Sequence, residues 1–140
     1  MKKIILLLLL TPMLAFAEAP FKQGTYWEVT SVEVHPGKFD AYIENLNDLW
    51  RKQMDKLIKE KKVVGYKLLS NVHAREGEPN LWLMVEWKSA GDMLDQPDEY
   101  WDKLMSDMVG SREDSAKRNI ERGELRDIMG STLVREVSFR

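Results

Sequence analysis

An amphipathic pattern near the start of the chain restricts the possible folds more than any other feature. Over residues 38–62 apolar side chains recur every three or four positions with charged side chains opposite, which predicts one long helix. The apolar positions are Phe39, Ile43, Leu46, Trp50, Met54 and Leu57. The segments on either side are rich in β-branched and aromatic residues, a composition typical of strands. The sequence therefore predicts a helix between two strands.

Four segments have the composition of strands. They are residues 25–35, 63–74, 81–87 and 132–139. Pro36 and Gly37 end the first strand, and a short turn at residues 75–80 joins the second strand to the third. Two strands joined by so short a turn form an antiparallel hairpin.

A second helix is expected after the third strand. Ser89, with Asp92 three residues later, forms a helix-start pattern, and helical spacing of apolar residues extends the helix over residues 93–109. The polar residues 111–129 are expected to form an exposed helix that breaks or ends near Gly123. The resulting order is that of a ferredoxin-like α+β fold, βαββαβ, with a four-stranded antiparallel sheet and an extra helix before the last strand.

The sheet of such a fold has two faces, and the helices cover only one. In the third strand one face carries Leu81, Leu83, Val85 and Trp87. The other face carries Trp82, Met84 and Glu86. We expect the fully apolar set to face the helices. The other face also carries apolar side chains, and so short a chain has no second layer to cover it. We therefore expect a homodimer in which two sheets face each other, since twofold dimers are the commonest soluble oligomers.

Residues 1–17 have the features of a cleavable secretory signal peptide. Two lysines precede a 14-residue apolar stretch at residues 4–17, shorter than the about 20 residues of a membrane-spanning helix. Ala15 and Ala17 suit the cleavage site, so the mature protein is expected to be one domain at residues 18–140, periplasmic or secreted. Without a cysteine to carry lipid, no stable membrane anchor is expected after cleavage.

Composition excludes several classes of function. Without the two N-terminal lysines the chain has 19 basic and 23 acidic residues, a net charge of −4, which is unlike the basic surface of a nucleic-acid-binding protein. The absence of cysteine excludes thiol catalysis, iron–sulfur clusters and thiolate zinc sites. The two histidines, His35 and His73, lack the spacing of paired metal ligands, so no metal and no other cofactor is expected.

Three short motifs stand at the junctions and the end of the expected elements. They are VHPGK at residues 34–38, VEWKS at residues 85–89 and TLVREVSF at residues 132–139. These motifs resemble the dimeric α/β-barrel superfamily, which includes antibiotic-biosynthesis-type monooxygenases and NIPSNAP-like proteins. The resemblance implies a sheet in the order 4-1-3-2 and a dimer with two clefts, each between sheet and helices.

The resemblance also separates two kinds of activity within this superfamily. Its haem-degrading members use an asparagine, a tryptophan and a histidine on the second helix. Trp82 or Trp87 would match the tryptophan, but residues 93–109 contain no histidine and the first strand contains no asparagine. If the protein is an enzyme, the resemblance therefore implies cofactor-free chemistry rather than haem degradation.

Candidate site residues lie on the less apolar faces of the strands. Burial of Glu86 among aromatic side chains would raise its pKa and suit it to proton transfer, or Arg135 would pair with it in an ordinary salt bridge. His73 is expected to share a strand face with Lys67 and Asn71, either inside a cavity or in water at a sheet edge. The catalytic candidates are Glu86 and His73, and the ligand-binding candidates are Trp82, Arg135, Asn71 and Lys67. Two further carboxylates, Glu28 and Glu33, lie on the first strand and have the same two possible roles as Glu86.

Three functions are compatible with these observations. The leading interpretation is a non-catalytic, exported homodimer that binds a small, partly apolar molecule in the cleft between sheet and helices. The first alternative is a cofactor-free monooxygenase or related isomerase, which would need a proton-transfer group in the cleft. The second is a structural or protein-binding module that uses the exposed helix at residues 111–129 as its contact surface.

Overall fold

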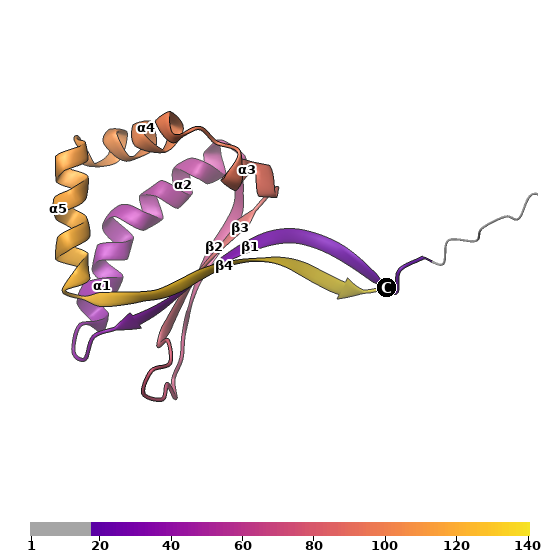
Figure 1. Cartoon of the computed structure of the whole chain (residues 1–140), viewed down its shortest axis with the longest axis horizontal. Coiled ribbons are helices and arrows are strands. Elements are labelled where there is room, and N and C mark those ends of the chain that lie inside the picture. Colours follow the sequence, from indigo (N-terminus) through magenta and orange to yellow (C-terminus); the bar gives the residue numbers. More distant parts are fainter. Residues whose placement is uncertain (1–17) are drawn as a thin grey trace, which may run out of the picture.

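The computed structural model describes residues 18–140, in which helices pack against an antiparallel sheet (Figure 1). The elements are β1 (Phe21–Val34), α1 (Phe39–Asn45), the π-helix η1 (Leu46–Trp50), α2 (Arg51–Lys59), β2 (Val63–Ser70), β3 (Leu81–Trp87), α3 (Ala90–Leu94), α4 (Asp98–Val109), α5 (Arg112–Gly123) and β4 (Arg126–Phe139). The expected signal peptide, residues 1–17, lies outside the described residues. Across residues 18–140, no helix has both the length and the apolar character needed to cross a membrane.

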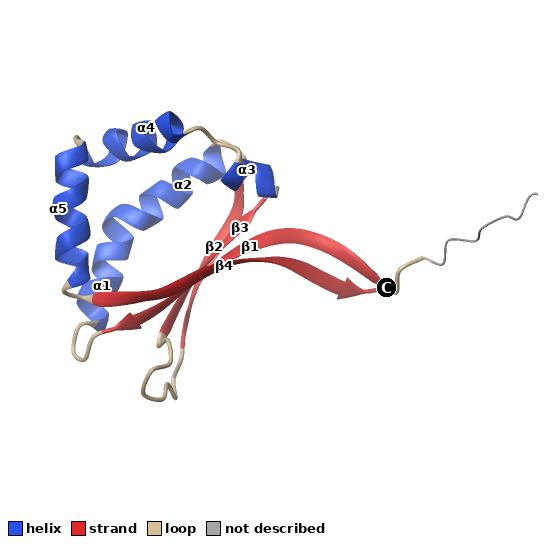
Figure 2. Ribbon diagram, in the orientation of Figure 1, coloured by secondary structure: helices blue, strands red, loops and turns tan. Residues whose placement is uncertain are grey.

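The four strands are hydrogen-bonded in the order β2-β3-β1-β4, and each neighbouring pair is antiparallel. The resemblance implies the order 4-1-3-2, which is the same order read from the opposite edge of the sheet. The helices lie on one side of the sheet (Figure 2), and α5 is the extra helix expected before the last strand. The chain therefore has the ferredoxin-like α+β fold that the sequence predicts.

Alternation along β3 separates the core from the uncovered face of the sheet. The side chains of Leu81, Leu83, Val85 and Trp87 are at most 6% exposed. Those of Trp82, Met84 and Glu86 are half-buried on the other side, so the predicted face assignment is confirmed. The open face, as we call the side without helices, carries Thr25, Trp27 and Val29 of β1, Lys67 and Leu69 of β2, Trp82, Met84 and Glu86 of β3, and Thr132 and Val134 of β4.

The long helix predicted over residues 38–62 contains a π-helical segment, η1. The buried residues along it are Tyr42, Leu46, Leu49, Met54 and Leu57. Trp50, at the end of η1, is partly buried and packs against the core between Leu46 and Met54. Phe39, predicted in the apolar row, is instead 40% exposed.

Strands β1 and β4 are longer than predicted. β1 begins at Phe21, and β4 begins at Arg126 rather than Thr132. Residues 126–129, which fall within the predicted exposed helix, pair with the second half of β1 instead, because strand pairing satisfies their backbone groups and a helix with so few apolar side chains gains little from packing. Beyond β3 the two strands continue as a two-stranded ribbon, visible in Figure 1.

Strand β2 ends at Ser70, four residues before its predicted end. The Asn71 side-chain oxygen accepts a hydrogen bond from the His73 backbone N–H at 3.1 Å, a local turn that competes with strand pairing. The Asn71 amide also donates to the Pro79 carbonyl at 3.3 Å. The prediction that His73 and Asn71 continue a strand face with Lys67 is therefore wrong, and His73 is exposed in the turn.

Asn80 joins the end of β1 to the start of β3. Its side-chain oxygen accepts from the Val34 N–H, and its amide donates to the Val34 carbonyl, both at 2.8 Å. The Asn80 backbone N–H donates to the Val32 carbonyl at 3.0 Å. One half-buried side chain thus satisfies both backbone groups of Val34 where the β1–β3 pairing ends.

We expect Asn80→Ala to lower the free energy of unfolding by about 1–3 kcal/mol, because it leaves two backbone groups without their partners. Urea unfolding of residues 18–140 at neutral pH measures the change. Asn47→Ala, which removes an exposed amide from η1, is the matched control and should change the free energy by less than about 0.5 kcal/mol. Equal, small effects in both variants would contradict the role of Asn80.

Candidate functional site

A cleft of about 450 Å³ lies between the helix-facing side of the sheet and the helices. This volume is within the range of small-molecule sites. Side chains from β1, β3 and β4 form its floor, and residues of all the helical segments line the rest. The lining combines three tryptophans, Trp50, Trp87 and Trp101, with the polar side chains of Glu28, Thr30, Gln53, Arg122 and Arg126.

The tryptophans form an aromatic wall. Trp87 of β3 packs edge-to-face against Trp101 of α4, with ring centroids 6.3 Å apart and an interplanar angle of 86°. Trp50 packs similarly against Tyr66 of β2, at 5.1 Å and 80°. Trp50 is the last residue of η1. Rings held in this way suit the apolar or aromatic body of a ligand.

Glu28 is the one acidic residue of residues 18–140 that lines the cleft. Its carboxylate accepts a hydrogen bond from the Trp87 indole N–H at 3.2 Å and one from the Ser131 hydroxyl at 3.4 Å. The Ser131 and Thr30 hydroxyl oxygens are 3.2 Å apart. These two neutral donors, from the strands on either side of β1, orient the carboxylate, which is able to accept a hydrogen bond or a proton from a ligand.

Two guanidinium groups, those of Arg122 and Arg126, line the cleft where α5 meets β4. Burial lowers the pKa of Arg122, and the neighbouring positive charge of Arg126 lowers it further. Arginine nevertheless stays protonated at neutral pH, so both groups are charged. The Nε atom of Arg126 is buried and has no hydrogen-bond partner within residues 18–140.

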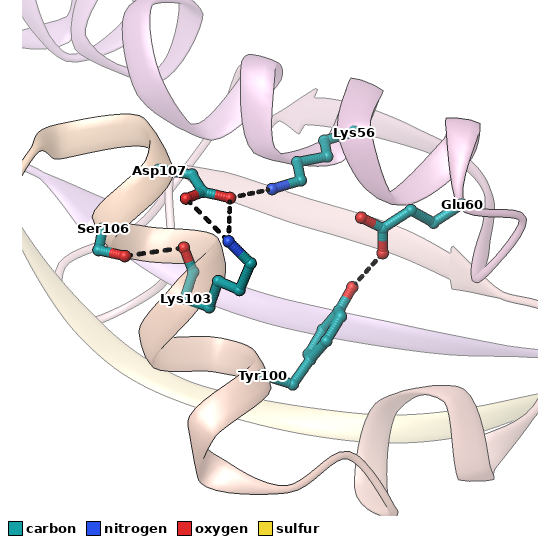
Figure 3. A network of polar contacts seen from close by, with 6 residues as sticks. All are labelled: Lys56, Glu60, Tyr100, Lys103, Ser106 and Asp107. Atoms are coloured by element: carbon teal, nitrogen blue, oxygen red, sulfur yellow. Dashed lines mark hydrogen bonds and ion pairs between the residues drawn. The ribbon is translucent and has the colours of Figure 1, made fainter.

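A polar network fixes α4 against α2 (Figure 3). Asp107 accepts hydrogen bonds from Lys56 at 3.0 Å and from Lys103 at 3.3 Å, and these ammonium groups hold the pKa of Asp107 below its usual range. The Tyr100 hydroxyl donates to Glu60 at 2.5 Å, and its pKa is raised by burial and by that carboxylate. Trp101 follows Tyr100 along α4 and lines the cleft. The network therefore positions part of the aromatic wall.

His35 connects the end of β1 to the junction between α5 and β4. Its backbone N–H donates to the Leu125 carbonyl at 2.9 Å, and its ring nitrogens lie 3.0 Å from Asp127 Oδ2 and 3.1 Å from the Glu124 carbonyl oxygen. Hydrogen bonds to Asp127 and to the Glu124 carbonyl raise the pKa of His35. Because Arg126 lies between these partners in the chain, His35 positions the start of β4, where Arg126 enters the cleft.

The raised pKa means that the folded state favours protonated His35. This contribution to stability is complete below the ordinary pKa of 6.5 and is lost as the pH rises through the folded-state pKa. We expect NMR titration to place the His35 pKa above 6.5 and Asp127→Asn to lower it. Asp102→Asn, which neutralises an exposed carboxylate on α4, is the control. Equal His35 pKa values in the wild type and in Asp127→Asn would contradict this assignment.

Three of the predicted site residues, Lys67, Trp82 and Glu86, lie together on the open face, opposite the cleft. The Lys67 ammonium is 4.4 Å from the ring centroid of Trp27. Glu86 accepts a hydrogen bond from the Thr25 hydroxyl at 2.7 Å. A hydroxyl rather than a guanidinium therefore holds Glu86, and the catalytic and binding roles assigned to these residues stay predictions.

The other three predicted residues are apart from this group. Arg135 lies over the Tyr26 ring at 4.9 Å and donates to the Gly24 carbonyl at 3.2 Å, and Asn71 and His73 are in the turn after β2. None of the six predicted residues is among those that line the cleft. Within residues 18–140, no group of three or more His, Cys, Asp or Glu side chains is arranged to hold a metal ion.

The polar residues of the cleft were only partly visible in the sequence. Glu28 was one of two further carboxylates noted on the first strand. Arg122 and Arg126 lie in residues 111–129, which the sequence predicts as an exposed helix that breaks or ends near Gly123. The relevant signal was Gly123, at which the helix does end. Beyond it the chain enters β4, and this change of direction brings both arginines to the cleft.

No protein-family model matches the chain, and no curated protein matches it either. Among solved structures, a dimeric ferredoxin-like protein from an uncultured marine organism is 7% identical with a TM-score of 0.48, over 84% of this chain and 90% of that chain. An antibiotic biosynthesis monooxygenase-like protein from Bordetella bronchiseptica is 15% identical with a TM-score of 0.44, over 81% and 96%.

A NIPSNAP family protein of unknown function from Agrobacterium tumefaciens is 15% identical with a TM-score of 0.46, over 83% of this chain and 89% of that chain. The two groups named for the sequence motifs are thus both among the similar structures. At these identities the similarity concerns the fold alone, and the function has to be argued from the site.

Proposed function

We propose that the protein is an exported homodimer that binds a small, partly apolar molecule in the cleft between sheet and helices. The observation that carries this proposal is the cleft itself, in which three tryptophans and a few polar groups surround about 450 Å³. A mostly apolar pocket with a small number of placed polar groups is the usual form of a small-molecule site. The network between α2 and α4 supports the proposal, because it holds the aromatic wall in place before a ligand enters.

The open face supports the homodimer. Leu69 and Val134 are 47% and 43% exposed on it, beside the half-buried Trp27, Trp82 and Met84. Within residues 18–140 the helices leave this face uncovered (Figure 2). A second copy related by a twofold axis would cover the same apolar patch on both protomers, which is the usual arrangement in soluble homodimers.

Export is supported by the N-terminal sequence. The charged start, the short apolar stretch and the small residues at positions 15 and 17 are typical of a cleaved signal. The mature protein would begin at Glu18 and be periplasmic or secreted. The intact mass of the protein isolated from its own host reports the cleavage site.

Glu28 supports a second candidate function, a cofactor-free monooxygenase or related isomerase. Its oriented carboxylate is inside the cleft and is able to take a proton from a bound substrate. A Glu28→Gln variant that still binds substrate but loses turnover would favour the enzyme. Ligand binding without turnover in the wild type would favour the binding protein.

Native mass spectrometry of the protein from its own host is expected to show a reproducible small-molecule adduct. Trp101→Ala should lower its occupancy about threefold or more, because it removes part of the aromatic wall. Trp27→Ala on the open face is the matched control and should keep the adduct. Absence of any adduct, together with no binding from a set of small aromatic compounds, would contradict the proposal.

Light scattering at micromolar concentration is expected to report a dimer for the wild type. Val29→Glu should shift the protein to monomer, because it places a charge at the centre of the open face. Ile120→Glu changes a 73% exposed residue on α5 and should leave the dimer intact. A monodisperse wild-type monomer would overturn the dimer. Loss of the dimer in Ile120→Glu instead would assign the interface to α5.

A further inference from the structure

The two arginines of the cleft come from different elements that meet at one end of it. Arg122 belongs to the last turn of α5, and Arg126 is the first residue of β4, paired with Val34 at the end of β1. In Figure 1 α5 stands at the edge of the molecule and leads directly into the start of β4. This end of the cleft therefore carries two positive charges on side chains that the fold holds close together.

Within the described part of the chain, neither charge is neutralised. No carboxylate of residues 18–140 is within salt-bridge distance of Arg122 or Arg126. Arg122 donates to neutral oxygens, the Arg118 carbonyl at 3.4 Å and the Asn119 side chain, and Arg126 Nε is buried without an acceptor. A buried donor without an acceptor is rare and costly in a folded protein.

Arg118 shows the contrast within the same helix. It lies one turn before Arg122 and forms a salt bridge with Asp48 at 3.2 Å. Its charge therefore has an ordinary structural partner. The two cleft arginines have none among the described residues, and an anionic acceptor placed between them would satisfy both.

The acidic residue of the cleft is separated from Arg126 along the backbone of the sheet. Glu28 is paired with Leu133, six residues along β1 from the pair formed by Val34 and Arg126, which is about 20 Å at strand spacing. Glu28 is held by the Trp87 indole and the Ser131 hydroxyl. The cleft therefore combines a pair of positive side chains with an aromatic wall, and no salt bridge joins Glu28 to either arginine.

We propose that the cleft binds an amphipathic organic anion, whose carboxylate is held by Arg122 and Arg126 and whose apolar body packs against the tryptophans. The inference rests on the proposed function and adds the chemical class of the ligand. A planar carboxylate matches the fork of a guanidinium group, so one arginine can donate two parallel hydrogen bonds to it while the other donates to a remaining lone pair.

Tryptophan fluorescence titration of the mature protein, residues 18–140, tests the anion directly. The probes are naphthoate and its neutral analogue naphthamide, with decanoate and decanol as the aliphatic pair. We expect at least one acid to bind about tenfold or more tightly than its neutral partner. Tighter binding of naphthoate would indicate an aromatic ligand body, and tighter binding of decanoate an aliphatic one. Either result supports the inference.

Arg126→Gln and Arg122→Gln are each expected to lower the affinity for the acid about tenfold and to leave that for the neutral analogue nearly unchanged. Arg118→Gln makes the same change of charge on α5 outside the cleft and should alter neither affinity. Thermal unfolding of each variant shows whether it is folded. If one of the two cleft variants does not fold, the other still provides the test.

Two results overturn the inference and leave the proposed function standing. One is equal binding of acids and their neutral analogues, and the other is unchanged affinity for the acid in both cleft variants. Failure of all four probes to bind at millimolar concentration would count against the cleft as a binding site, and therefore against the proposed function as well.

Discussion

The pairing of β1 with β4 is the constraint on which the rest of the structure depends. β1 pairs with β3 on one side, and the last strand returns to its other edge. Helix α5 spans the distance from the end of α4 to that edge (Figure 1). The pair formed by Val34 and Arg126 then brings the end of α5 beside the floor of the cleft. Without this pairing Arg126 would not reach the cleft through the start of β4.

The same sheet separates two surfaces of different character. Its helix-facing side contains the cleft, where Trp87 and Glu28 are joined by a hydrogen bond and Trp101 is held by the contacts between α4 and α2. Its open face contains half-buried apolar side chains with Glu86 and Lys67 among them. A role in ligand binding fits the first surface and a role in association fits the second, because only the first is enclosed by helices.

The order of the elements was predictable because it depends on local periodicity. Alternation with a period of two identified β3 to the residue, and the capping pattern at Ser89 was confirmed by its hydrogen bond with the Asp92 N–H. The errors arose where a tertiary contact overrides the local pattern. The start of β4 is a strand only because β1 is beside it, and the π-helix η1 interrupts a segment whose spacing predicts one regular helix.

The sequence by itself determined the fold class, the extent of β3 and which residues of β3 share a face, since these follow from repeats of two and about 3.6 residues within short segments. Only the tertiary structure decided which polar residues meet in the cleft. Glu28 and Ser131 are 103 positions apart, and Arg126 enters the cleft through a strand pairing with a residue near the start of the chain. Contacts between such distant segments depend on strand register and chain direction, and neither is a property of the local sequence.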